Sequence, residues 1–402
     1  MTVDRTLELS ELSVECDAQP SPECFAGAIL PGATLGVVGG GQLGRMFALA
    51  ARRMGYRVAV WCDELGPATE CADHVLVADY QDLDAGRKFF SNISAITFET
   101  EKLPVSLFQA AAKLVPVRPG IPFLEMSQNR IREKTGLQQA GLPVGPFHVV
   151  RSLADLEAGI ARLGTPAILK TASGGYDGKG QIRIEANSDL GDVWTALGTN
   201  EAILEAFVPF VDEISVVAAR DASGTCVTYG PIHNTHSQHI LDVSYCPVEL
   251  PEVVQSRAIG AATKIAETFA VVGVFCVELF VLADGQVWVN EIAPRPHNSG
   301  HLTIEGHVTS QFEQQVRCLC GLPVGSAALV RPVAMANLLG DRWELGQPDW
   351  ERLAGEFPDV QWHLYGKTEA RRGRKMGHLT VTEDAANAAV IKVLAARTAL
   401  TR

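Results

Sequence analysis

Two glutamates, Glu278 and Glu291, have the spacing in this chain that most directly suggests chemistry. Each lies in an apolar, strand-like run, and the turn signal Asp284-Gly285 separates the two runs. A hairpin would bring both carboxylates into one apolar region, where they would repel each other unless a cation lay between them. Oxygen ligands without clustered histidine or cysteine suit Mg²⁺ that bridges substrate phosphates, so we interpret the pair as metal ligands. The alternative is two solvated glutamates on opposite strand faces.

A glycine-rich segment is the second candidate site. Four glycines stand in residues 174–180 among Tyr176, Asp177 and Lys179, and Lys170 ends the apolar run before them. Glycine loses the most conformational entropy on ordering, so this composition favours a loop over a helix or strand. Because Lys170 and Lys179 converge on it, we predict a lid that closes over phosphate groups. A flexible hairpin without a ligand would have the same composition.

Prolines hold a third group of polar side chains outside regular structure. Arg295, His297 and Asn298 follow Glu291 closely, in a segment where Pro294 and Pro296 restrict the backbone. The planar guanidinium group of Arg295 suits an oxyanion such as carbonate or phosphate. We therefore predict that this segment lies at the edge of the metal site.

Two further motifs leave several interpretations open. Gly39-x-Gly41-x-x-Gly44 follows an apolar run and precedes a helical pattern, with Asp63 further on, as in a dinucleotide-binding turn. The same glycines fit NAD, another phosphate ligand, or a purely structural turn. A basic cluster, Lys367 with residues 371–375, is either a solvated loop or a pocket for a substrate phosphate.

Composition excludes several classes of function. The 402 residues carry 34 Lys+Arg against 46 Asp+Glu, a net charge of −12, which argues against broad binding to nucleic acid or to an anionic membrane. No apolar run approaches the ~20 residues of a membrane span. Nine cysteines without a C-x-x-C pair, and an acidic N-terminus without an apolar core, favour the reducing cytoplasm.

The elements that must position these residues suggest an α/β domain followed by α+β structure. Strand-like runs alternate with helical patterns after an acidic tail, which predicts a parallel sheet. We divide the chain into the acidic tail 1–33, an N-terminal α/β domain 34–130, a central α+β domain 131–325 and a C-terminal domain 326–402.

Four motifs taken together identify a family. Residues 39–46, 174–181, 290–301 and 373–378 resemble the ATP-grasp ligases, and among them the 5-(carboxyamino)imidazole ribonucleotide synthetases of purine biosynthesis. The resemblance implies an ATP-grasp architecture: an N-terminal parallel-sheet (pre-ATP-grasp) domain, a central ATP-grasp domain with a glycine-rich lid at about 146–208, and a small C-terminal domain.

The resemblance also implies an activity. A carbon–nitrogen ligase of this kind uses ATP and Mg²⁺ to join bicarbonate to 5-aminoimidazole ribonucleotide through carboxyphosphate, releasing ADP and phosphate. It implies small-molecule partners only, with no nucleic acid or membrane, and a homodimer in the cytoplasm.

Site residues follow from the same resemblance, position by position. The nucleotide-binding set comprises Arg130, Lys170, Gly175, Tyr176, Asp177, Gly178, Lys179, Gly180, Gln181, Glu205, Ala206, Phe207, Val208, Glu213, His236, Asn290 and Glu291. Glu278 and Glu291 are the implied Mg²⁺ ligands, the backbone of residues 205–208 would read adenine, and Glu213 would bind the ribose hydroxyls. The catalytic set that would hold bicarbonate and carboxyphosphate comprises Arg295, His297, Asn298 and Asp177. The ribonucleotide set comprises Gln42, Leu43, Glu99, Tyr176, Asp177, Lys367, Arg374 and Lys375.

Two departures and three rivals accompany this interpretation. The acidic tail extends beyond the usual family start, and Ala293 stands where many ATP-grasp enzymes have an Asn ligand. One rival is the formate-dependent glycinamide ribonucleotide transformylase. That family has Asp at the position of Asn298 and Glu at the position of Gln42. The others are an NAD-dependent dehydrogenase, based on the glycine motif with Asp63, and a non-catalytic nucleotide-binding regulator.

Overall fold

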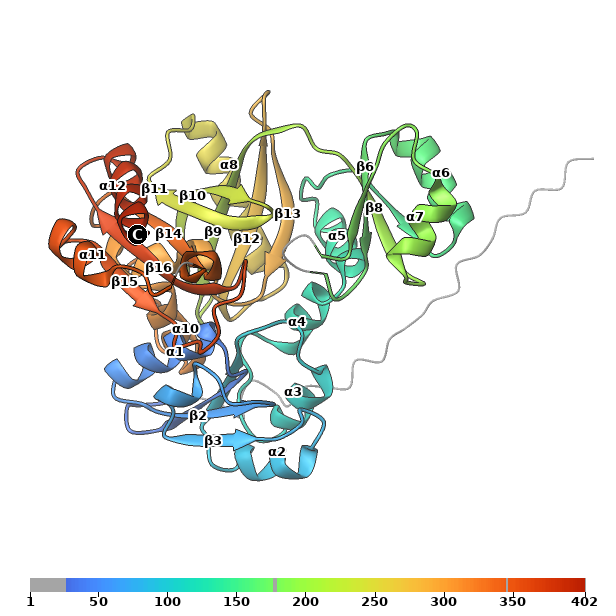
Figure 1. Cartoon of the computed structure of the whole chain (residues 1–402). Coiled ribbons are helices and arrows are strands. Elements are labelled where there is room, and N and C mark those ends of the chain that lie inside the picture. Colours follow the sequence, from blue (N-terminus) through green and yellow to red (C-terminus); the bar gives the residue numbers. More distant parts are fainter. Residues whose placement is uncertain (1–26, 176–178, 345, 402) are drawn as a thin grey trace, which may run out of the picture.

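The structure is a computed structural model that describes residues 27–175, 179–344 and 346–401. Figure 1 shows three groups of strands around one junction, with the N-terminal strands in blue, a small green sheet to one side, and a larger yellow-to-red sheet. Over the described residues, no helix combines the length and the apolar character needed to cross a membrane.

Of the predicted tail, only residues 27–33 are described, and they are bonded to the body of the protein. The Ile29 N–H donates to the Cys320 carbonyl at 2.8 Å, and the Tyr56 hydroxyl donates to the Ile29 carbonyl at 2.7 Å. Ile29 also packs beside the core of the N-terminal sheet. This stretch therefore behaves as part of the N-terminal fold.

The N-terminal sheet is parallel and has the strand order β3-β2-β1-β4, as the alternation of strands and helices predicts. Its strands are β1 (Thr34–Val38), β2 (Arg57–Cys62), β3 (His74–Val77) and β4 (Ala95–Phe98). Its helices are α1 (Gln42–Arg53), α2 (Leu83–Phe90), α3 (Val105–Ala111) and α4 (Ile121–Ser127). Every residue of β1 and β4 is buried, as expected of a parallel strand covered by helices on both faces.

A small antiparallel sheet with the order β5-β8-β6-β7 follows the linking helix α5 (Arg130–Gln139). Its strands are β5 (Phe147–Val150), β6 (Ala167–Thr171), β7 (Gln181–Ile184) and β8 (Ala202–Ala206). Helices α6 (Leu153–Leu163) and α7 (Leu190–Leu197) pack on one another, and their apolar residues share a core with these strands. The glycine-rich segment joins β6 to β7, so it begins at the strand that carries Lys170.

The largest sheet has eight antiparallel strands in the order β13-β12-β9-β10-β11-β14-β16-β15. They are β9 (Phe210–Arg220), β10 (Cys226–Ser237), β11 (Ile240–Cys246), β12 (Gly273–Leu282), β13 (Val287–Ala293), β14 (Val333–Leu339), β15 (Gln361–Leu364) and β16 (Lys375–Thr382). Its helices are α8 (Glu252–Thr268), α9 (Thr303–Gly306), α10 (Gln311–Leu319), α11 (Trp350–Glu356) and α12 (Ala386–Ala399), with a short 3₁₀ helix at Asn298–Leu302.

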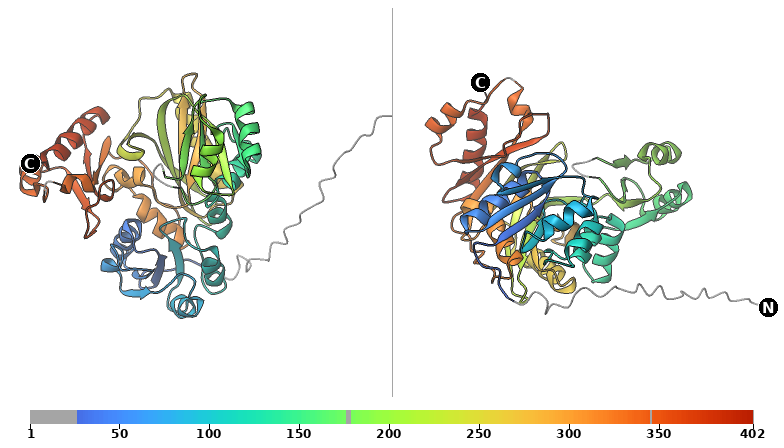
Figure 2. Two further views of the ribbon diagram at one scale, coloured as in Figure 1. Left: turned by 45° about the vertical axis from the view of Figure 1, so that its right-hand side comes forward. Right: turned by 90° about the horizontal axis from the view of Figure 1, so that it is seen from below.

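This sheet crosses the domain boundary that we placed at residue 325. Strand β11 of the central part pairs with β14 of the C-terminal part, with Tyr245 opposite Ala334. From the sequence we predict no strand at β11 or β16, and Lys375, the last residue of the basic cluster 371–375, is the first residue of β16. The C-terminal strands thus extend the central sheet, and Figure 2 shows the red C-terminal helices at the side of this sheet.

Aromatic packing joins the linking helices to the large sheet. Phe123 of α4 meets Phe275 of β12 edge to face, with ring centroids 5.4 Å apart, and Phe275 is fully buried. Both belong to one apolar core that also contains Leu137 of α5. Because α5 carries candidate ligands, this core sets the position of the site against the sheet.

Replacing Phe275 by Ala should therefore destabilise the protein by about 3–5 kcal/mol, because a large buried side chain leaves a cavity. The measurement is the urea and thermal unfolding midpoint. Val253→Ala on the exposed face of α8 is the control and should change stability by less than about 0.5 kcal/mol. Equal stability of the Phe275 variant and the wild type would contradict this view of the core.

Candidate active site

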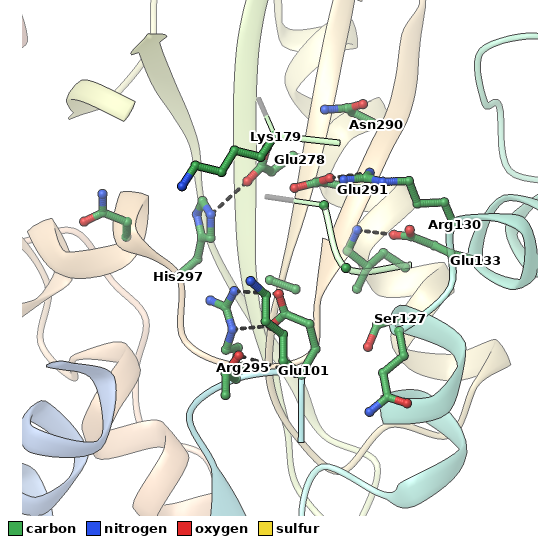
Figure 3. A pocket seen from close by; sticks show the side chains of 18 of the residues that line it. Glu101, Ser127, Arg130, Glu133, Lys179, Glu278, Asn290, Glu291, Arg295 and His297 are labelled. Atoms are coloured by element: carbon green, nitrogen blue, oxygen red, sulfur yellow. Dashed lines mark hydrogen bonds and ion pairs between the residues drawn. The ribbon is translucent and has the colours of Figure 1, made fainter. Parts of the chain in front are cut away.

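A cavity of about 1250 Å³ lies where the three sheets meet, and most of the predicted site residues line it. Figure 3 shows side chains from α5, the large sheet and the loop after β13 pointing into it. The predicted residues in its lining are Gln42, Leu43, Glu99, Arg130, Lys170, Gly175, Lys179, Gln181, Glu213, His236, Glu278, Asn290, Glu291, Arg295, His297, Asn298 and Lys375.

The remaining predicted residues are not in this lining. Those that the structure describes are Gly180, Glu205, Ala206, Phe207, Val208, Lys367 and Arg374. Tyr176, Asp177 and Gly178, which we assigned to the lid, the ribonucleotide and catalysis, lie outside the described residues.

The glutamate pair is built as the hairpin pattern predicts. Glu278 of β12 and Glu291 of β13 are directly opposite each other in the ladder. Each carboxylate also has a cationic partner from the chain: His297 Nε2 lies 2.8 Å from Glu278, and Arg130 Nη1 lies 2.9 Å from Glu291. We expected a metal because the two carboxylates would repel each other. That reason is not sufficient, since His297 and Arg130 already compensate both negative charges.

The His297–Glu278 pair keeps both groups charged. Burial would raise the pKa of Glu278, but the charge and the hydrogen bond of His297 outweigh it and lower this pKa to about 2. Burial would lower the pKa of His297, yet the neighbouring Cys276 and Glu278 raise it well above the ordinary histidine value. The site thus contains an imidazolium–carboxylate pair at neutral pH.

Arg295 does not present a free guanidinium fork to the cavity. Its Nε and Nη2 atoms donate to the two oxygens of Glu101 at 2.6 and 3.1 Å, and its Nη1 donates to the Pro296 carbonyl at 3.2 Å. The fork that we expected to hold an oxyanion is therefore occupied by a carboxylate. Burial would raise the pKa of Glu101, but Arg295 lowers it to about 2. Arg295 retains further N–H groups for a ligand, since a guanidinium has five.

A buried charged cluster surrounds Glu205, one of the residues predicted to bind the nucleotide. Lys170 Nζ donates to Glu205 at 2.7 Å, and Lys134 Nζ lies 3.8 Å from the other oxygen of Glu205. Burial would raise the pKa of Glu205, but the two lysines lower it to about 2. Glu205 thus positions Lys170 at the cavity wall and is not itself in the lining.

Residues 206–208, which we expected to read adenine through their backbone, do not line the cavity in this structure. The N–H groups of Ala206 and Phe207 already donate to the carbonyls of Pro146 and Pro166, at 2.9 and 3.2 Å. Neither these two residues nor Val208 reaches the cavity lining. Their assignment to adenine remains a prediction that the present geometry does not support directly.

The glycine turn at the start of α1 is filled by a carboxylate. Glu99, just after β4, accepts hydrogen bonds from the N–H groups of Gly41 and Gly44, the second at 2.7 Å. A Cβ atom at Gly39 or Gly41 would lie only 2.3 or 2.6 Å from Glu99. The glycines therefore make room for Glu99, which stands where a dinucleotide turn would hold a pyrophosphate. The NAD interpretation loses its structural basis.

The basic cluster reaches the cavity through one residue. Lys375 lines the cavity, and Lys367 donates to its carbonyl at 2.7 Å. Burial and the charge of Arg374 lower the pKa of Lys367 to about 8. Arg374 donates to the Glu369 carbonyl at 2.9 Å, close behind.

His236 and Glu213 contact each other at the cavity wall, with His236 Nδ1 3.1 Å from a Glu213 oxygen. Burial opposes protonation of His236, but Glu213 prevails and raises its pKa. The glutamate that we assigned to the ribose hydroxyls therefore has a protein partner in this structure.

Several site residues were missed by the sequence analysis, although two signals pointed to them. Glu101 stands two residues after Glu99 beyond the carboxyl end of a parallel strand, where ligands of such sheets bind. Glu133 and Lys134 follow Arg130 at helical spacings of three and four, so all three share one face of α5. Glu133 accepts from the Ile292 N–H at 2.5 Å, and burial together with Glu291 raises its pKa to about 8.

Family models match nearly all of the described chain. Residues 32–128 match the ribonucleotide synthetase preATP-grasp domain, residues 135–312 the ATP-grasp domain, and residues 333–392 the phosphoribosylaminoimidazole carboxylase C-terminal domain. The sheet order and the cavity at the junction agree with this division. The fold and the site thus define an ATP-grasp protein, which confirms the predicted fold class.

Relatives with known names narrow the assignment. The chain is 40% identical over 354 residues to the N5-carboxyaminoimidazole ribonucleotide synthase of Bacillus subtilis, covering 88% of this chain and 92% of that protein. The homologous synthase of Pseudomonas aeruginosa is also 40% identical, over 86% and 94% of the two chains. The bifunctional purine synthesis protein purC/E of Dictyostelium discoideum is 39% identical, but the match spans only 37% of its length.

Solved structures agree. The ADP complex of an N5-carboxyaminoimidazole ribonucleotide synthetase superposes with a TM-score of 0.87 at 39% identity, covering 92% of this chain and 98% of that one. The enzyme of Aspergillus clavatus, in complex with ADP and 5-aminoimidazole ribonucleotide, gives 0.81 at 26% identity over 92% and 98%. The chain belongs to the N5-carboxyaminoimidazole ribonucleotide synthase family.

The buried carboxylates predict how stability depends on pH. Glu205, Glu101 and Glu278 have pKa values near 2 in the folded state against an ordinary 4.5. The unfolded chain therefore binds more protons than the folded chain between these values. The stabilisation by these carboxylates is complete above about pH 4.5 and should be lost as the pH falls towards 2. Urea unfolding at a series of pH values measures the free energy of unfolding and so tests this dependence.

Glu205→Gln tests the largest of these clusters. It leaves Lys134 and Lys170 without their carboxylate and should cost about 3–5 kcal/mol at pH 7, with a shallower loss of stability in acid. Glu201→Gln, which breaks an exposed pair with Arg151, is the matched control and should cost less than about 1 kcal/mol. Unchanged stability of the Glu205 variant would show that the cluster is not charged as described.

Proposed function

We propose that this protein carboxylates 5-aminoimidazole ribonucleotide with bicarbonate at the expense of ATP, giving N5-carboxyaminoimidazole ribonucleotide, ADP and phosphate in purine biosynthesis. The observation that carries the proposal is the single cavity at the junction of the three sheets. It unites Lys170 from the small sheet, the Glu278–Glu291 pair from the large sheet and Glu99 from the N-terminal sheet. The names of the relatives support the same reaction.

The reaction sequence explains why three sheets are needed. Bicarbonate is a poor electrophile, so one of its oxygens first attacks the γ-phosphorus of ATP, which forms carboxyphosphate and releases ADP. The exocyclic amine of the ribonucleotide then forms a bond to the carboxyl carbon, phosphate leaves, and the amine loses a proton. The first step depends on positioning and charge neutralisation. Lys170 and Lys179 at the cavity wall supply positive charge for the phosphates of ATP.

The residues present fit Mg²⁺ only together with substrate oxygens. Glu278 and Glu291 offer hard oxygen donors side by side, but the described residues contain no group of three or more acidic, histidine or cysteine side chains arranged to hold a metal alone. Mg²⁺ usually keeps few protein carboxylates and completes its shell with phosphate and water. When bound, it would neutralise charge on the transferred phosphoryl group. Ala293 provides no further ligand.

For the carboxyl group, His297 and Asn298 are the proposed contacts. His297 is fixed by Glu278, and both polar atoms of the buried Asn298 amide are without a hydrogen-bond partner. A buried amide without partners is costly, so a ligand that bonds to Asn298 would be stabilising. Arg295, locked on Glu101, contributes charge and its remaining N–H groups.

For the ribonucleotide, Gln42 and Leu43 at the start of helix α1 and Lys375 on strand β16 line the cavity from the N-terminal domain and from the large sheet. We propose that Lys375 binds the 5′-phosphate, with Lys367 and Arg374 behind it adding positive charge, and that Glu99 binds the ribose. The homodimer remains a prediction from the family resemblance, and the cytoplasmic location remains a prediction from the cysteine usage and the acidic N-terminus.

Omission of single substrates tests the reaction. ADP release from Mg-ATP should require both bicarbonate and 5-aminoimidazole ribonucleotide, because the amine consumes the activated carboxyl group. Glycinamide ribonucleotide with formate should give no release. ADP release only with glycinamide ribonucleotide and formate would favour the transformylase. No ADP release with either pair of substrates would favour the non-catalytic regulator.

Substitutions at the proposed ATP and Mg²⁺ site and behind the proposed ribonucleotide site should have different kinetic effects. Lys170→Ala and Glu278→Ala should lower kcat at least ~10³-fold, because the first removes a positive charge that faces the phosphates and the second removes a proposed ligand of the Mg²⁺ that would neutralise them. Arg374→Ala should mainly raise KM for the ribonucleotide, about tenfold. The exposed Glu157→Ala on α6 is the control and should match the wild type. Full activity of the first two variants would refute the site assignment.

A further inference from the structure

Gln311, fully buried at the start of α10, is held in one orientation by the backbone of His297. Its amide oxygen accepts from the His297 N–H at 2.9 Å, and its amide nitrogen donates to the His297 carbonyl at 2.7 Å. Exchanging the oxygen and the nitrogen would place donor against donor and acceptor against acceptor. The positions of the two amide hydrogens are therefore determined by the backbone.

This orientation dictates the protonation of a neighbouring histidine. The same Gln311 nitrogen lies 3.1 Å from Nδ1 of His301, which is 1% exposed. Because the amide nitrogen can only donate, Nδ1 of His301 must accept and cannot carry a proton. His301 is therefore neutral, with its single proton on Nε2.

The electrostatic surroundings act in the same direction. Burial lowers the pKa of His301 far below the ordinary histidine value, and the charges of His297, His363, Lys375 and Arg295 lower it further. The packed partners are rings: Phe312 at 5.5 Å, with Tyr365 and His378 on other sides. The burial and these four charges all oppose an imidazolium ion at His301.

His301 shares a face with Asn298. Both belong to the 3₁₀ helix Asn298–Leu302, in which residues three apart stand one above the other. Both line the cavity. Among the residues that the structure describes, His301 Nε2 has no hydrogen-bond partner, and it is not one of the buried polar atoms closed off from solvent.

We propose that His301 donates a hydrogen bond from Nε2–H to an oxygen of the bicarbonate-derived carboxyl group, next to Asn298, and that Gln311 is the positioning residue that holds this tautomer. This inference rests on the proposed function for the identity of its ligand. A neutral imidazole with a depressed pKa donates without losing its proton at neutral pH. It can therefore stabilise negative charge on the carboxyl oxygens while the amine attacks, without protonating the water-sensitive intermediate.

The tautomer can be measured without any turnover. Two-bond ¹H–¹⁵N spectra of protein labelled at histidine, with His301 assigned by the loss of its signals in His301→Gln, should show Nδ1 unprotonated and Nε2 protonated from pH 6 to 8. In Gln311→Glu the new carboxylate can only accept, so the proton of His301 should move to Nδ1 or the ring should become cationic. A wild-type Nδ1 that carries a proton, or an unchanged pattern in Gln311→Glu, would overturn the inference.

Kinetics supply the second test. His301→Phe keeps the ring volume and removes the donor, so kcat for carboxylation should fall about 10²-fold with thermal stability near that of the wild type. His301→Gln keeps an N–H donor and should recover part of this loss. His307→Phe is the matched control, since His307 is buried against Tyr229 and lies outside the cavity lining.

The outcomes separate this inference from the proposed function. A folded His301→Phe protein with wild-type kcat would overturn the role of His301 alone. A wild type without bicarbonate-dependent turnover would overturn the proposed function, while the nitrogen spectra would still decide the tautomer.

Discussion

Compensation of buried charge between distant segments is the constraint on which the rest of this structure depends. Arg295 and Glu101 are 194 residues apart in sequence, and Arg130 and Glu291 are 161 apart, yet each pair meets inside the cavity wall. Leaving one member of such a pair alone would leave a partly buried charge uncompensated, so the pairs favour the arrangement in which the elements that carry them meet. The pairs join the N-terminal domain and α5 to the large sheet, and the geometry of the cavity is a consequence.

Glu99 shows how one side chain can change the meaning of a sequence motif. The spacing of Gly39, Gly41 and Gly44 fits a dinucleotide turn, because glycine there permits close approach of an anion to the N-terminus of a helix. In this structure the anion belongs to the protein, and the two N–H donors at the start of α1 are already used. What remains for a ligand at this edge is the carboxylate itself and the residues beside it, which suits hydroxyl groups better than a pyrophosphate.

The sequence was most informative where local pattern determines structure. The parallel N-terminal sheet, the β12–β13 hairpin and the opposition of Glu278 and Glu291 follow from alternation and a turn signal, so they could be predicted. The partners of these two glutamates could not, because His297 and Arg130 meet them through tertiary contacts that the spacing of the glutamates does not encode. Strand β16 was missed because its first residue, Lys375, belongs to a basic cluster whose charges hide the start of the strand pattern.

The large sheet explains why the C-terminal strands belong to the site. Glu278 on β12 and Lys375 on β16 face one cavity, although β9, β10, β11 and β14 lie between their strands. A continuous hydrogen-bonded sheet fixes their separation far better than two domains joined by a linker would. The proposed phosphates of ATP and of the ribonucleotide would bind near these two ends. The frame that holds the glutamates therefore also sets the distance between the activated carboxyl group and the amine that must attack it.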